Sequence, residues 1–195
     1  MSQRYATLSS YEDVGNVALR GSEILAFRTQ FDRASRTLSF SAREPGGMLC
    51  DLDSTAHNIT RRQVDGRLAG CIPKEGDLDA VLGALTGVTW GVAHIVPRLL
   101  LGPALVGNCV ADARAPKLIA SGWFDEEECN LIDLGPDWRG SIVAIGAQSS
   151  LLRRKVVAVA RGIGRQHQKS VIEANDLWLN SVGMVIRYSP SVELS

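Results

Sequence analysis

Few features that assign a protein to a specialised class are present in this sequence of 195 residues. It has only four cysteines, and none forms the Cys-x-x-Cys pair of a zinc ribbon or a dithiol motif. Basic and acidic side chains number 21 each, and a net charge of zero argues against a general polyanion binder. The first residues lack the apolar stretch of a signal peptide, and no unbroken apolar run reaches the ~20 residues of a spanning helix. These absences favour a cytosolic protein that is not secreted and has no transmembrane segment, with its thiols reduced.

Catalytic patterns are also lacking. The three histidines, His57, His94 and His167, occur in neither H-x-H nor H-E-x-x-H spacing, so no metal site is predicted. The glycine-rich pieces at 83–87 and 162–164 lack the length and the Lys-Ser/Thr ending of a phosphate loop. His94 lies in an apolar segment and is expected to be a core histidine. We therefore predict a protein that is not an enzyme and holds no cofactor.

What the sequence does contain is a succession of short apolar segments separated by turn residues. It is 45% hydrophobic with 19 glycines, and Val, Ile and Ala recur in short runs, which favours strands. Asp77 is a candidate cap for one short helix, residues 24–31 fit either a strand or a helix, and 61–79 reads as a loop. Strands are predicted at 37–41, 88–96, 104–113, 117–124, 130–134, 141–147 and 177–188, with the acidic run 125–128 as a hairpin tip. Residues 155–161 also alternate as a strand does, although 149–160 could instead begin as a helix.

This succession predicts a mainly β protein, a single β-sandwich or jelly-roll-like barrel with few short helices. We expect one domain over residues 1–195. Within it, 1–35 would be a less regular N-terminal segment and 36–190 the β-sandwich core.

Two charged features are candidate functional groups. Asp112 and Arg114 end an apolar run and, two apart on a strand, would point to the same face as a pair that fixes the neighbouring loop. The simpler alternative is a strand end where the chain meets water. The second feature is a basic segment without an intervening acid: Arg153, Arg154, Lys155, Arg161, Arg165 and Lys169. It is either a solvated face or the footprint of a nucleic acid.

The second half of the chain resembles the thirty-kilodalton superfamily of plant-virus movement proteins. The resemblance covers residues 88–188 and is carried by loose hydrophobic patterns. They are Gly91-Val-Ala-His-Ile as one strand, Val110-Ala-Asp112-Ala-Arg114 as a strand closing on Asp, and Ser181-Val-Gly-Met-Val-Ile-Arg-Tyr188 as a last barrel strand.

The resemblance implies binding of single-stranded RNA without sequence preference, self-association and carriage of a viral genome between cells. It implies a place in the host cytoplasm and at plasmodesmata, with host cell-junction proteins as further partners. The basic segment would follow the phosphates, and Trp138, Trp178 or Tyr188 would stack on bases. Two alternatives stay open: a small single-jelly-roll viral capsid protein, and a non-enzymatic cellular β-sandwich interaction module.

Overall fold

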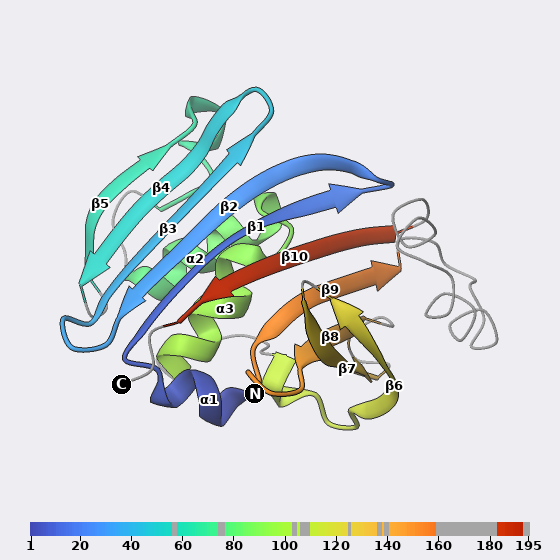
Figure 1. Ribbon diagram of the computed structural model, residues 1–195. Helices are drawn as coiled ribbons and strands as arrows, with labels where there is room; N and C mark the ends of the chain where they lie inside the picture. Colours follow the sequence, from blue (N-terminus) through green and yellow to red (C-terminus); the bar gives the residue numbers. More distant parts are fainter. Residues whose placement is uncertain are drawn as a thin grey trace. The chain divides into compact units, whose positions relative to one another are not determined.

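Ten strands among the residues described below form one antiparallel sheet, as a computed structural model shows (Figure 1). It describes residues 1–55, 58–73, 77–102, 105, 110–124, 126–135, 138, 141–158 and 183–192. The strand order is β5-β4-β3-β2-β1-β10-β9-β8-β7-β6, so β5 and β6 are the edge strands of the part of the sheet that the structure describes. The prediction of a mainly β fold with few helices is confirmed.

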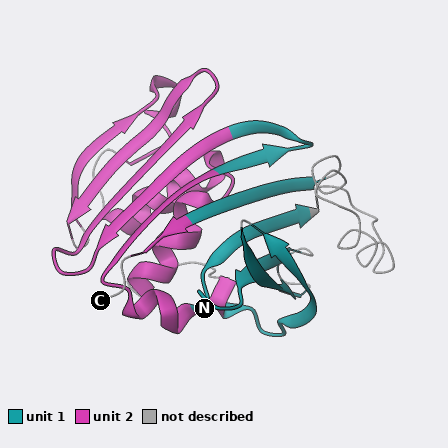
Figure 2. Ribbon diagram, viewed as in Figure 1, with its two compact units in different colours: residues 1, 16–24, 112–189 teal, residues 2–15, 25–111, 190–195 magenta. Residues whose placement is uncertain are grey.

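By compactness the chain divides into two units (Figure 2), and each is described by itself below. Unit 1 comprises residue 1, residues 16–24 and residues 112–189, and unit 2 comprises residues 2–15, 25–111 and 190–195. The single-domain organisation expected from the sequence stays a prediction.

Residues 1–35, expected to be less regular, contain α1 (Ser2–Thr7), β1 (Ser10–Leu19) and β2 (Ser22–Asp32). Arg33 ties the end of α1 to the sheet, because its guanidinium donates to the carbonyls of Tyr5 (2.9 Å) and Leu8 (2.7 Å). Further along, β3 (Thr37–Glu44) confirms the strand predicted at 37–41. It forms a hairpin with β4 (Gly47–Thr55), a strand that the sequence patterns did not predict. β5 (Asn58–Val64) occupies the start of the segment read as a loop, which continues through the short 3-10 turn η1 (Gly66–Leu68).

In unit 2 the strands bury one face against two helices, α2 (Leu78–Val88) and α3 (Val92–Leu101) (Figure 1). Alternate strand residues such as Phe27, Leu38 and Phe40 are buried, as are Leu82 and Leu85 of α2. Burial of this apolar surface, at about 25 cal/mol per Å², is the main stabilising contribution in this unit.

The strand predicted at 88–96 is wrong, because these residues form the end of α2, a turn and the first half of α3. An apolar run buried on all sides has no period that distinguishes a strand from a helix. The turn is made by Trp90 and Gly91, both with positive φ (57° and 92°), and α3 includes Pro97. The predicted helix cap is confirmed, since the Asp77 carboxylate accepts from the backbone N–H of Ala80 at 2.9 Å.

Unit 1 contains the strands β6 (Lys117–Phe124), β7 (Glu127–Asp133), β8 (Ile142–Gly146) and β9 (Leu152–Ala158). β10 (Gly183–Ser191) pairs with β9 from Gly183 to Arg187, and residues 177–182 of the predicted last strand lie outside the described residues. The strands predicted at 117–124, 130–134 and 141–147 are confirmed, and so is the acidic hairpin tip between β6 and β7. One face packs a small apolar cluster whose buried members are Cys129, Leu131, Ile142 and Ala144.

Candidate functional site

Two large apolar side chains are exposed on β6, an edge strand of the sheet. Leu118 is 62% exposed and Trp123 is 74% exposed. In the pairing with β7, Leu118 lies opposite Ile132 and Trp123 opposite Glu128. Ile132 and Glu128 are four residues apart on β7, so Leu118 and Trp123 lie on the same face of the hairpin. Scattered apolar side chains are normal on a surface, but here a pair of them shares one face of an edge strand.

A bulge in β6 explains why Leu118 and Trp123 share a face although they are five residues apart. The register with β7 shifts between Leu118 and Ala120, which inserts one extra residue into β6. On the opposite face Ile119, Ala120 and Phe124 pack against the apolar cluster of unit 1. The hairpin is therefore anchored through one face and presents the other to solvent.

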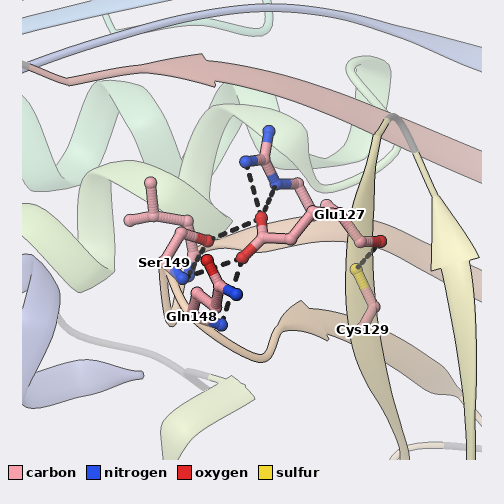
Figure 3. Close-up of polar contacts among 6 residues, drawn as sticks. Glu127, Cys129, Gln148 and Ser149 are labelled. Atoms are coloured by element: carbon pink, nitrogen blue, oxygen red, sulfur yellow. Dashed lines mark hydrogen bonds and ion pairs between the residues drawn. The ribbon is translucent and has the colours of Figure 1, made fainter.

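A carboxylate at the start of β7 fixes the hairpin to the neighbouring strands (Figure 3). Glu127 accepts from the Nε (2.9 Å) and Nη2 (2.7 Å) of Arg153 on β9 through one oxygen. That oxygen also accepts from the Ser149 hydroxyl, and the other oxygen accepts from the backbone N–H groups of Gln148 and Ser149. Five donors thus converge on one carboxylate, which holds β7, the β8–β9 turn and β9 together.

The surroundings of Glu127 keep it ionised. Burial raises the pKa of its carboxyl, but the hydrogen bonds from Ser149 and Arg153 outweigh burial and the pKa lies below its usual range. The side chains of Glu127 and Arg153 are only 13% and 17% exposed, so the pair is shielded from salt. Gly146 leaves room for this arrangement, since a Cβ there would collide with the Ser149 hydroxyl and the Glu127 carboxylate.

The structure gives the first three residues of the basic segment internal contacts. Arg153 pairs with Glu127, an acid that is distant in sequence but adjacent in space. Arg154 is only 8% exposed and its guanidinium lies 4.5 Å from the centre of the Phe124 ring. Lys155 lies over the Trp138 ring at 5.4 Å, and burial lowers the pKa of its ammonium group. Arg161, Arg165 and Lys169 lie outside the described residues.

Asp112 and Arg114 do not end a strand. Of the strand predicted at 104–113, the structure describes residue 105 and residues 110–113, and Val110–Asp112 is a 3-10 turn, η3. Both charged side chains are exposed. The prediction of a strand-end pair is therefore wrong, because the apolar run that precedes Asp112 does not continue as a strand into it.

Of the three aromatic residues considered for base stacking, the two that the structure describes are not exposed as stacking requires. Tyr188 is fully buried in β10, Trp138 is half-buried beneath Lys155, and Trp178 lies outside the described residues. His94, expected in the core, is buried in α3. Within the described ranges, no three His, Cys, Asp or Glu side chains are grouped as a metal site would need. No helix among those ranges has the length and apolar character to cross a membrane.

The sequence patterns did not single out Leu118 and Trp123. Only the strand order shows that β6 is an edge strand, and a Trp in a predicted strand is normally a core residue. The sequence contains one signal. Trp123 lies between Gly122 and Phe124, so in a strand it points to the face opposite theirs, and an acidic turn follows. A large apolar residue out of phase with the buried face is a candidate for contact with a partner.

The comparisons with known proteins give a fold. No protein-family model and no curated protein sequence matches the chain. MucB, solved in complex with MucA(peri), aligns with 100% of this chain and 53% of its own at 7% identity and a TM-score of 0.51. The MucA/MucB complex of Pseudomonas aeruginosa matches at 7% identity and 0.49, over 100% of this chain and 56% of that one. The lipoprotein LppX of Mycobacterium tuberculosis matches at 11% identity and 0.39, over 96% and 91%.

This chain therefore has a mainly β fold similar to part of MucB, and it spans about half the length of the MucB chain that it matches. The expectation of a viral movement protein is wrong, because the fold matches that of MucB, a bacterial protein. The capsid alternative and the location in host cytoplasm and at plasmodesmata are wrong for the same reason. The role of the basic segment in carrying viral RNA was implied by the movement-protein resemblance, so it is withdrawn together with that expectation. Moreover, Gly91–Ile95, which resembled a strand of that family, includes the start of α3.

Proposed function

We propose that this protein is a non-enzymatic binding protein that pairs an extended polypeptide segment with the outer edge of β6. The observation that carries the proposal is the pair Leu118 and Trp123, exposed on one face of an edge strand. Of the three hypotheses drawn from the sequence, the non-enzymatic interaction module is the one closest to this proposal.

Strand addition fits the chemistry of this edge. An edge strand presents unpaired backbone N–H and C=O groups that an extended segment satisfies, and side chains next to the new strand supply specificity. Trp is among the residues that contribute most binding energy when an interface buries them. Leu118 and Trp123 would flank such a segment on one face and exclude water from its hydrogen bonds.

The hairpin is also rigid enough to act as a template. Glu127 fixes β7 to the β8–β9 turn and to Arg153, and Phe124 at the end of β6 lies beneath the Arg154 guanidinium. A site held in its bound shape loses less conformational entropy on association. The match to MucB, whose structure was solved in complex with MucA(peri), supports a polypeptide as the bound species.

Site-specific photo-crosslinking in the native cells tests this proposal. A benzophenone amino acid replaces Ser121, an exposed residue on the same face between Leu118 and Trp123. The matched control carries it at Gln63, an exposed residue of the other edge strand, β5. We expect one dominant polypeptide adduct from position 121, identified by mass spectrometry, that is lost when Trp123→Ser is added. Equal adducts at both positions, none at 121, or an adduct indifferent to Trp123→Ser would overturn the proposal.

A further inference from the structure

The outer edge of β6 is complementary to itself. We infer that its partner is β6 of a second copy of this chain, paired antiparallel about a two-fold axis. The inference rests on the proposed function and names the polypeptide that it binds.

The positions of the exposed apolar residues carry the first part of the inference. β6 runs from Lys117 to Phe124, and Leu118 and Trp123 are each one residue in from an end. When two such strands lie side by side in opposite directions with their ends level, Leu118 of each copy faces Trp123 of the other. The two residues share a face of the strand, as directly opposed residues in an antiparallel pair must. The register that pairs β6 over its full length is thus also the register that buries both Leu–Trp pairs.

Charge carries the second part. Exposed Lys117 is the first residue of β6, with Asp133 of β7 opposite it, and exposed Glu126 lies two residues after the last residue of β6. In the antiparallel pair the basic end of each strand meets the acidic turn of the other. A parallel pair would bring like charges together at both ends, which is unfavourable.

The same features confine the association to a closed dimer. A two-fold pairing uses both copies of the β6 edge, so it adds no third copy through that edge. The bulge at Ile119 and the opposite charges at the two ends make shifted registers poorer. The edge is therefore specified for one partner in one register.

Charge reversal distinguishes a second copy from any other polypeptide. In the antiparallel pair Lys117 of each copy meets Glu126 of the other. Lys117→Glu places two carboxylates at each of these contacts and Glu126→Lys places two ammonium groups there, so each single variant replaces both attractive contacts with repulsive ones. An equimolar mixture restores complementarity at both ends, and so does the double variant Lys117→Glu/Glu126→Lys. A contact with a different protein, or a self-contact elsewhere on the chain, has no reason to follow this pattern.

Sedimentation velocity on the purified protein over a range of concentrations measures the association. We expect the parent chain, the mixture and the double variant to be dimers, and each single variant to have a dissociation constant raised at least about tenfold. Trp123→Ser is expected to raise it about thirtyfold, as loss of a central aromatic contact does. Far-ultraviolet circular dichroism and the melting temperature check that each variant is folded, which exposed side chains should permit.

A parent chain that stays monomeric, or single variants that dimerise as well as the parent, would contradict the pairing of β6 with a second copy. So would a mixture of the two single variants that stays monomeric while the parent dimerises. If the crosslinker at position 121 then captures a different polypeptide, the proposed function survives with another partner. If it captures nothing, both are wrong.

Discussion

The two edge strands of the sheet, β5 and β6, carry different side chains. On β5, the exposed Arg61 guanidinium bridges Asp51 (3.0 Å) and Asp53 (2.6 Å) of the adjacent β4. On β6, Leu118 and Trp123 are exposed instead. Charged residues on an edge strand discourage pairing with another chain, whereas exposed apolar residues favour it. The two edges show how side chains alone determine whether an edge strand is closed to a partner or suited to one.

Two shielded carboxylates, one in each unit, are also held in opposite ways. In unit 1, Glu127 is neutralised by Arg153 and its pKa is low. In unit 2, Asp13 is fully buried and held by neutral donors, the Tyr11 hydroxyl (3.0 Å) and the Thr29 N–H (3.1 Å). Burial raises the pKa of Asp13 to about 6, with the hydrogen bonds from Thr29 and Tyr11 opposing part of that rise. The Arg153 guanidinium accounts for the opposite directions of the two pKa shifts. A nearby positive charge outweighs the effect of burial on a carboxyl group, whereas neutral donors offset it only in part.

Removal of the Glu127 carboxylate is expected to have the largest effect on stability. Glu127→Ala leaves the Arg153 guanidinium and two backbone N–H groups of the β8–β9 turn without their acceptor, which should lower the free energy of unfolding by about 2–3 kcal/mol. Urea denaturation measures the change. The matched control is Glu128→Ala, an exposed neighbour expected to shift it by less than about 0.5 kcal/mol. Equal effects of the two substitutions would contradict the role assigned to Glu127.

Asp13 and Glu127 contribute pH dependences of opposite sign to the stability of the protein. The unfolded chain releases the Asp13 proton near its ordinary pKa of 3.8, and the folded protein releases it near 6. Stability from this group is therefore fully present below about pH 4 and is lost as the pH rises to about 6. Asp13→Asn has no proton to lose at this position, so its free energy of unfolding should not fall between pH 4 and pH 7 on account of residue 13. The parent should lose about 1–3 kcal/mol more than the variant over that range.

Denaturation of both proteins at several pH values measures that difference. Subtraction of the two curves removes the other titrating groups, including Glu127, whose low pKa gives stability that is lost as the pH falls. A difference that stays flat between pH 4 and 7 would show that Asp13 ionises normally.

The smallest effect is expected at the edges themselves. Arg61→Ala on β5 removes only exposed ion pairs, and Trp123→Ser on β6 removes only exposed surface. Neither should measurably change the melting temperature at a concentration where the protein is monomeric. The two variants should instead differ in association. Trp123→Ser is expected to weaken it, and Arg61→Ala to leave it unchanged in sedimentation velocity. A large loss of stability with Trp123→Ser would mean that the side chain supports the fold.

Much of the fold was predictable wherever one face of a strand is buried. The segment that became β3 alternates between apolar and polar residues, short apolar runs bounded by turn residues marked β6, β7 and β8, and Asp77 caps its helix as expected. The prediction failed at 88–96, where the residues from Val92 to Val96 are all buried and show no period. It failed again for Arg153, because absence of acids along the sequence says nothing about acids across a sheet.

The sequence by itself determined the mainly β class, the turns and the local strands, because alternation and turn chemistry act over a few residues. The tertiary structure alone decided that β6 is an edge strand, that Glu127 faces Arg153 and that Leu118 and Trp123 share a face. Each of these depends on strand order and register, which are set by long-range pairing. The candidate site therefore became visible only with the fold, since its residues owe their exposure and their partners to strands that are distant in sequence.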